Sequence, residues 1–518
     1  MPTTVRSGVR FDGAVTWLVL CSATVAVLYS SQLLPFYDYY QWLFQGHVVS
    51  GLLFGTDASS LGLARTYSLD PVPVPNLAAP LGIAVLDVFL PIEAAGQLFV
   101  VLTVLAFAIS FGYLVRTLQG RATPIEFLGF LWAPGFYLYK GYLSFMVGLA
   151  LVFVLVAVLH RAVGTPDGPG RGRLVQLGLL GVGLYLTHLV AWGIGGLAVL
   201  LHALVLARTG RGRRALFLLG TVLPGVLLAA WYVGAERGGD GVVLYSSWFD
   251  KAISLTETLQ LFLRLDPFPA VWPLFWLNLG LAVAFTALVL FQLDRRALRA
   301  AVEGRPVLWL AGLLAGIALV LPISMINGLI KPDERFVMPA LLLAVAALPY
   351  RAVRARLTVV TGLLVVGVLG LHAVEYVDVG RRIARVDAAT DAAVPAGSPL
   401  LYLTVPSRHG CEDTPGVTVG VPTLKWFGVD HAIETGQEKV NVDETSIVRA
   451  REPMTGGMTV LARSPAEVPG AVLPSAADHP YVQAVACPAD LAGVEQVLAP
   501  AYTPVAEGDG YAILRRTW

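Results

Sequence analysis

The chain has 518 residues, of which 56% are hydrophobic and only 14% are charged, and its mean hydropathy is +0.70. This composition excludes a soluble globular protein and indicates an integral membrane protein that crosses the bilayer several times. The net charge is only +1, so no overall field attracts nucleic acid or an acidic partner.

The first predicted element is an apolar segment at residues 12–34, preceded by Arg6 and Arg10. It is longer than the core of a signal peptide and does not end in a cleavage site of small residues. We therefore expect a retained first transmembrane helix, with the N-terminus in the cytoplasm.

A long outer loop at residues 35–93 follows, and it opens within "LPFYDYYQW", residues 34–42. Asp38 stands there among five aromatic residues. It can cap the next helix within an interfacial aromatic belt, or it can act as a general base toward a hydroxyl acceptor. Asp70, in "YSLDPVP" of the same loop, is the second candidate acid. The apolar stretch 76–90 contains Pro80 and Asp87 and is too short to span, which favours an interfacial or re-entrant helix.

Ten further apolar runs predict membrane spans, which with the first helix gives about 11. They lie near residues 94–115, 123–139, 142–160, 174–187, 190–207, 215–233, 271–293, 306–328, 337–350 and 357–377. Arginine clusters fall between every second pair of these runs, as the positive-inside rule requires. Residues 1–378 are thus expected to form an α-helical polytopic membrane domain, with a second long outer loop at 234–270.

Hydrophobicity falls after residue 378, and residues 379–518 alternate short β-like runs with turns rich in proline and glycine. An odd number of spans places this predicted α/β domain outside the cytoplasm. Cys411 and Cys487 both lie in it, and we expect them to form a disulfide there. No internal repeat is visible, which argues against the inverted repeats of many secondary transporters.

Four basic side chains lie in short outer turns, against the positive-inside bias. They are Lys140 in "YLYKGYLSF", His188 in "YLTHLVAW", and Lys331 and Arg335 in "LIKPDERF". A lipid phosphate is the obvious partner for such groups. The alternative is that the lysines extend to lipid headgroups and that the histidine is an ordinary interfacial residue. No motif has metal-ligand spacing, and the need for a divalent cation stays open.

The order of these features resembles the GT-C superfamily of integral-membrane glycosyltransferases, in an uncharacterised bacterial branch. The resemblance rests on Asp38, "PVPVPNLAAPLG" (71–82), "KGYLSFMVGLAL" (140–151), "YLTH" (185–188) and "PDERF" (332–336). It implies a sugar transferred from a polyprenyl-phosphate donor to a hydroxyl acceptor on a glycan or lipid. Asp38 would be the general base, and Arg335 with His188 would contact the donor phosphate. Many members carry a second acid beside the first, whereas this chain has one.

A single carboxylate suffices for inversion, because the acceptor attacks one face of the sugar while the phosphate leaves from the other. Two other functions remain open, a transporter or flippase of a lipid-linked substrate and a non-catalytic scaffold whose outer domain binds a partner. High arginine, alanine, glycine and valine usage indicates a prokaryotic cell membrane.

Overall fold

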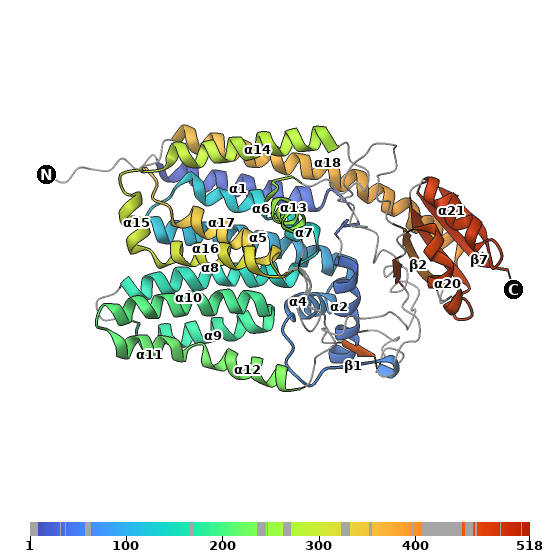
Figure 1. Cartoon of the computed structure of the whole chain (residues 1–518), viewed down its shortest axis with the longest axis horizontal. Helices are drawn as coiled ribbons and strands as arrows, with labels where there is room; N and C mark the ends of the chain where they lie inside the picture. The colour runs from blue at the N-terminus through green and yellow to red at the C-terminus, as the bar shows by residue number, and fades with distance from the viewer. Residues whose placement is uncertain are drawn as a thin grey trace.

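The computed structural model is predominantly helical, with a small sheet domain at the C-terminal end (Figure 1). It describes all residues except 1–8, 32, 37, 57–63, 165–168, 236–244, 246, 263–270, 323–331, 352–354, 396–397, 399, 406–447, 451–458, 462–463, 487, 509 and 518.

The membrane region contains α1 (Val9–Leu28), α2 (Tyr39–Phe54), α4 (Ala78–Asp87), α5 (Ile92–Gln119), α6 (Gly129–Trp132), α7 (Phe136–Tyr139), α8 (Leu143–Gly164), α9 (Arg171–Thr187), α10 (Leu189–Arg208), α11 (Gly212–Gly220), α12 (Leu223–Gly234), α13 (Trp248–Leu259), α14 (Val271–Gln292), α15 (Leu298–Gly304), α16 (Pro306–Val320), α17 (Glu334–Ala347) and α18 (Ala355–Ala393). Within the described residues, α5, α8, α10 and α18 are long and apolar enough to cross a membrane. Helices α11 and α12, bent by 43°, form a fifth candidate span, and shorter apolar helices lie in α1, α14 and α16. The chain is therefore a multi-pass membrane protein, and the helices of the described residues do not confirm the expected number of about 11 spans.

One predicted span, residues 123–139, is broken into pieces. It forms a 3-10 helix at Pro124–Leu128 followed by α6 and α7, with Pro134 and Gly135 between the last two. Every residue of the segment is buried, and the Tyr376 hydroxyl donates a hydrogen bond to the Pro134 carbonyl (3.0 Å). Irregular backbone is tolerated at membrane depth when neighbouring protein groups satisfy it, which is the case here.

The C-terminal region contains a five-stranded mixed sheet. Its strands are β2 (Leu400–Val405), β4 (Thr459–Leu461), β5 (Tyr481–Ala486), β6 (Tyr502–Gly508) and β7 (Tyr511–Arg516), in the order β4-β2-β5-β7-β6. Helix α21 (Pro488–Leu498) packs on it through a separate hydrophobic core that includes Leu401 and Val494. An α/β domain is present as expected. The predicted boundary at residue 378 lies inside α18, which continues to Ala393 and contacts the sheet through Thr390 and Gln483 (3.1 Å).

The loop at residues 35–93 is tied to the C-terminal part of the chain. Strand β1 (Tyr67–Leu69) pairs antiparallel with β3 (Val448–Ala450). Helix α2 lies beside both strands, at the end of the bundle that faces the sheet domain (Figure 1).

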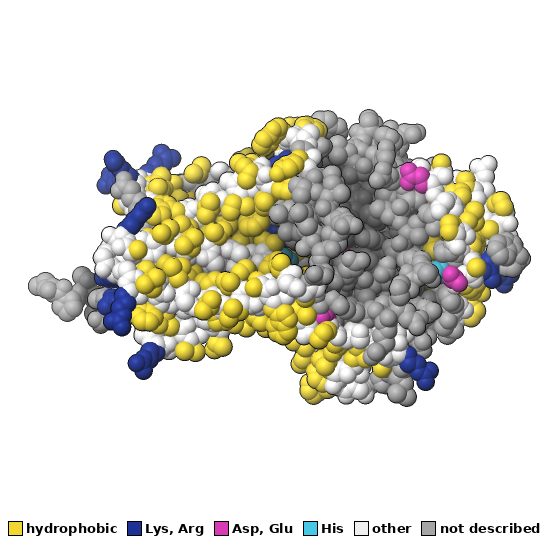
Figure 2. Space-filling model, turned by 60° about the horizontal axis from the view of Figure 1, so that its bottom comes forward, with side chains coloured by type: hydrophobic (Ala, Val, Ile, Leu, Met, Phe, Trp, Pro, Cys, Tyr) yellow, Lys and Arg dark blue, Asp and Glu magenta, His cyan; other side chains and the backbone are white. Residues whose placement is uncertain are grey.

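Charged and hydrophobic side chains occupy different zones of the surface along the long axis of the molecule (Figure 2). Most visible lysine and arginine side chains gather at the end of the bundle opposite the sheet domain, where α9 begins and α10 meets α11. Hydrophobic side chains cover the helices between the two ends, as expected for a lipid-facing surface.

Candidate active site

Asp38 lies against the turn that joins α7 to α8. Gly141 in that turn has a φ of +71°, and a Cβ atom there would stand 2.6 Å from the backbone nitrogen of Asp38. The Trp42 indole donates a hydrogen bond to the Gly141 carbonyl (2.7 Å). Glycine is therefore required twice, for its conformation and for the close approach. Asp38 precedes α2, yet its side chain makes no capping hydrogen bond, which argues against the helix-cap interpretation.

Arg335, in the first turn of α17, reaches the same place. Its guanidinium lies 4.8 Å from the centroid of the Tyr142 ring, within the range of a cation–π contact. Burial raises the pKa of Tyr142, Arg335 opposes this rise, and the charges of Glu334 and Asp38 add to it. Asp38 and Arg335 are therefore within electrostatic reach of one phenol. No described residue accepts a hydrogen bond from the buried Nε–H of Arg335, which leaves this donor available to a ligand.

His188 lies at the junction of α9 and α10. Its Nδ1 accepts a hydrogen bond from the Val190 backbone N–H (3.1 Å), and its ring packs on Phe145, with the two ring centroids 4.9 Å apart. Burial lowers the pKa of His188 well below its usual range, and the charge of Arg335 lowers it further. The ring is thus neutral at pH 7, and its Nε2 carries the proton. His188 can offer a hydrogen bond to a phosphate there, but not a positive charge.

The sequence motifs of this region converge through hydrogen bonds. The Asn76 and Leu77 backbone N–H groups donate to the Leu186 carbonyl (3.2 and 2.8 Å), next to His188. Ser144 donates to the Asn76 carbonyl (3.2 Å) and accepts from the Ala79 N–H (3.0 Å). The "PVPVPN", "YLTH" and "KGYLSF" segments therefore form one structural unit around the turn that supports Asp38.

Lys140 is buried in the same turn, with 6% of its surface exposed. Its ammonium lies 5.4 Å from the centroid of the Phe136 ring and 5.6 Å from that of Tyr139. Such burial does not fit a lysine that extends to lipid headgroups at the surface.

Asp70 follows β1, and its Oδ1 accepts a hydrogen bond from the Val72 N–H (2.9 Å), which closes a local turn. Lys331, Cys411 and Cys487, the other predicted site and disulfide residues, lie outside the described residues.

Two buried acids lie directly beside Arg335 in the candidate site, and their partners on another helix were not identified from the sequence. Asp333 and Glu334, both fully buried, immediately precede Arg335. Lys251 of α13 lies 3.3 Å from Asp333, and Ser254 of the same helix donates a hydrogen bond to Glu334 Oε1 (2.6 Å). Helix α13, in the loop at residues 234–270, therefore fixes the start of α17. The "PDERF" motif pointed to this turn, but no local pattern identified Lys251 or Ser254.

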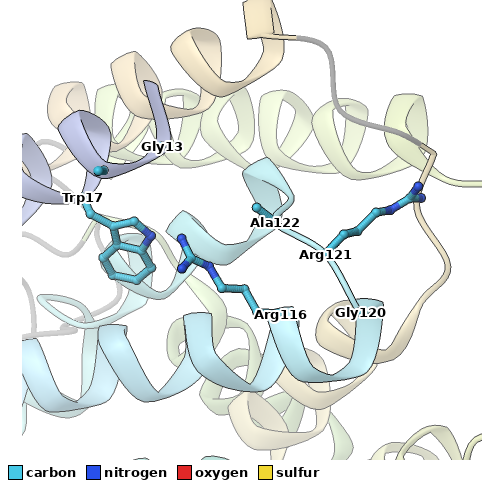
Figure 3. A pocket seen from close by; sticks show the side chains of 7 residues that line it. Gly13, Trp17, Arg116, Gly120, Arg121 and Ala122 are labelled. Atoms are coloured by element: carbon cyan, nitrogen blue, oxygen red, sulfur yellow. The ribbon is translucent and has the colours of Figure 1, made fainter. Parts of the chain in front are cut away.

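No group of three or more histidine, cysteine, aspartate or glutamate side chains with metal-binding geometry occurs in the part of the chain that the structure describes. A cavity of about 680 Å³ lies at the other end of the bundle, beside the start of α1 and the end of α5. Figure 3 shows that Trp17 and Arg116 approach each other there, whereas Arg121 points away. Arg116 is paired with the buried Glu126 (2.6 Å). The cavity is therefore separate from the Asp38 site, which lies beside the opposite end of α5.

Comparison with known proteins gives a fold relationship. No protein-family model and no curated protein sequence matches the chain. Two solved structures of ArnT from Cupriavidus metallidurans are similar, one bound to undecaprenyl phosphate and one in the apo state. Each has a TM-score of 0.52, and the sequence identities to this chain are 16% and 15%, respectively. Both alignments cover 97% of this chain, and they cover 97% and 98% of the two ArnT chains. The chain therefore has the fold of these two ArnT structures.

Proposed function

We propose that this protein is an inverting membrane glycosyltransferase that moves a sugar from a polyprenyl-phosphate donor to a hydroxyl acceptor on the outer face of the membrane. The observation that carries the proposal is that Asp38, Arg335 and His188 all lie against one short segment, from Gly141 in the α7–α8 turn to Phe145 at the start of α8. The shared fold with ArnT, one structure of which is bound to undecaprenyl phosphate, adds support.

The distribution of charge supports the outer placement. Arginines at the start of α9 and between α10 and α11 gather at the end of the bundle opposite the sheet domain (Figure 2). The positive-inside rule assigns that end to the cytoplasm. Asp38 and the C-terminal domain then lie on the extracytoplasmic side.

In the proposed mechanism, the Asp38 carboxylate accepts the proton of the acceptor hydroxyl as that oxygen attacks the anomeric carbon. The sugar-phosphate bond breaks on the opposite face, so the configuration inverts. Arg335 offers its Nε–H and its charge to the departing phosphate, and His188 offers its Nε2–H. The Lys140 ammonium, buried in the turn beside Asp38, adds positive potential.

The proposal is tested by mass spectrometry of the lipids that co-purify in mild detergent. We expect a polyprenyl phosphate, with or without a sugar, to remain bound to the wild type and to be lost from Arg335→Gln. The exposed Arg213 on α11 provides the matched control, and Arg213→Gln should retain the lipid. If a folded preparation retains only bulk phospholipid, the transferase proposal fails, and a scaffold becomes the better interpretation. Retention without any sugar transfer would instead favour a transporter or flippase.

A further inference from the structure

Two buried glutamines extend the Asp38 site along α2. Gln41 and Gln45 follow Asp38 by three and seven positions, a spacing that puts all three on one face of a helix. Gln41 is 7% exposed and Gln45 only 1%. At a rise of about 1.5 Å per residue, they lie about 4.5 and 10.5 Å from Asp38 along the helix axis.

Their side-chain amides lack hydrogen bonds that buried polar groups normally make. Nε2 of Gln41, and both Nε2 and Oε1 of Gln45, are buried and have no hydrogen-bond partner within the described residues. By contrast, Gln97 on α5 donates to the carbonyls of Leu28 (3.1 Å) and Ser31 (3.0 Å). An unsatisfied buried polar group destabilises the folded state, so a natural protein that keeps such groups needs a reason to do so.

The surroundings of the two amides indicate what they bind. On one side, Trp42 is held against the turn that supports Asp38. On the other, Phe44 packs on the fully buried Tyr67 of β1, with the ring centroids 5.6 Å apart. An amide offers two donors and an acceptor, which matches adjacent hydroxyl groups, and aromatic residues beside a few polar groups are typical of ligand sites.

We propose that Gln41 and Gln45 form a subsite that binds sugar hydroxyls. The inference rests on the proposed transfer reaction and extends it. Gln41 lies near enough to Asp38 to contact the sugar at which the new bond forms, and Gln45 lies one turn further along. The sugar is that of the donor or that of a glycan acceptor, and both present the same hydroxyl chemistry.

Thermal unfolding of Gln45→Met distinguishes a binding role from a structural one. Methionine has a similar length and no unsatisfied amide, so the variant should be at least as stable as the wild type. Gln97→Met is the matched control, and it should be less stable because two backbone carbonyls lose their donor. If Gln45→Met unfolds as early as Gln97→Met, the amide has a structural role and the proposal is overturned.

Binding is measured on the same proteins. In native mass spectrometry, undecaprenyl phosphate is allowed to compete for the protein with undecaprenyl phosphate that carries a hexose or a pentose. In a separate experiment, methyl glycosides serve as acceptor mimics, and the change in unfolding temperature is measured. We expect the wild type to prefer one sugar-bearing lipid about tenfold, or to be stabilised by one glycoside, and Gln45→Met to lose that effect. Loss of lipid discrimination identifies the donor sugar, whereas loss of the glycoside shift identifies the acceptor.

No preference in the wild type, or an unchanged preference in Gln45→Met, would overturn the subsite. Sugar discrimination by a wild type that transfers no sugar would leave the subsite standing and would overturn the transferase proposal instead.

Discussion

Replacing Lys251 should destabilise the junction of α13, α16 and α17. The Lys251 ammonium lies 3.3 Å from Asp333, and the two side chains are only 6% and 0% exposed. The same ammonium donates to the carbonyls of Ala318 (3.4 Å) and Leu321 at the end of α16. One side chain of α13 therefore joins the end of α16 to the start of α17, beside Arg335.

The size of the effect follows from burial. At 3.3 Å and an effective dielectric constant of about 20, the attraction of the pair is about 5 kcal/mol. Desolvation offsets much of that in the intact protein, but Lys251→Met leaves the Asp333 carboxylate buried without its cation. Breaking one partner of a buried pair destabilises by about 3–5 kcal/mol, whereas replacing both partners with apolar residues is close to neutral.

Thermal unfolding in detergent tests this directly. We expect Lys251→Met to unfold well below the wild type and Lys251→Met/Asp333→Leu to recover most of the loss. The exposed Arg213 gives the control, because Arg213→Met removes a cation without leaving a buried acid. If the double variant is no more stable than Lys251→Met, the pair is not the cause and the reasoning is refuted.

Two further predictions concern the turn and the histidine beside Asp38. Gly141→Ala should lower sugar transfer far more than Gly210→Ala. Both glycines have a positive φ, but only at Gly141 would a Cβ stand 2.6 Å from the backbone nitrogen of Asp38. Equal losses in the two variants would contradict the close packing at Gly141. Because burial lowers the pKa of His188, the unfolded chain binds a proton below about pH 6.5 that the folded protein does not. The free energy of unfolding should therefore decrease as the pH is lowered, by up to about 1.4 kcal/mol per pH unit. In His188→Asn, whose side chain can still accept from the Val190 N–H, unfolding temperatures between pH 7.5 and 5.5 should fall less steeply, and an unchanged slope would exclude this histidine as the cause.

Much of the fold could be predicted because its signals are local. Apolar runs and arginine clusters indicated the spans, and the fall in hydrophobicity indicated the second domain. The breaks in residues 123–139 were missed because tertiary contacts, such as the Tyr376 hydrogen bond to Pro134, make the irregular backbone tolerable. The continuation of α18 to Ala393 was missed because a helix that leaves the membrane loses its apolar pattern without ending.

In the candidate site, too, residues with a local sequence signal could be predicted and residues defined by tertiary contacts could not. Asp38, His188 and Arg335 could be selected because an acid among aromatic residues and basic groups in outer turns are unusual at their positions. Lys251, Gln41 and Gln45 carry no such signal, because a buried ion pair or an unsatisfied amide exists only once distant segments have packed together. Whether such a side chain has a hydrogen-bond or ion-pair partner depends on the tertiary structure, and the local sequence does not show it.

The role of Asp38 is the central claim, and one measurement tests it most directly. Sugar transfer and polyprenyl-phosphate binding are compared in the wild type, Asp38→Asn and the control Asp294→Asn, an acid in an exposed turn whose Oδ1 accepts from the Arg296 N–H (3.1 Å). If Asp38 is the general base, Asp38→Asn should bind the lipid normally but transfer sugar about 10²–10⁴-fold more slowly, while the control remains active. Transfer by Asp38→Asn at the wild-type rate would contradict the account.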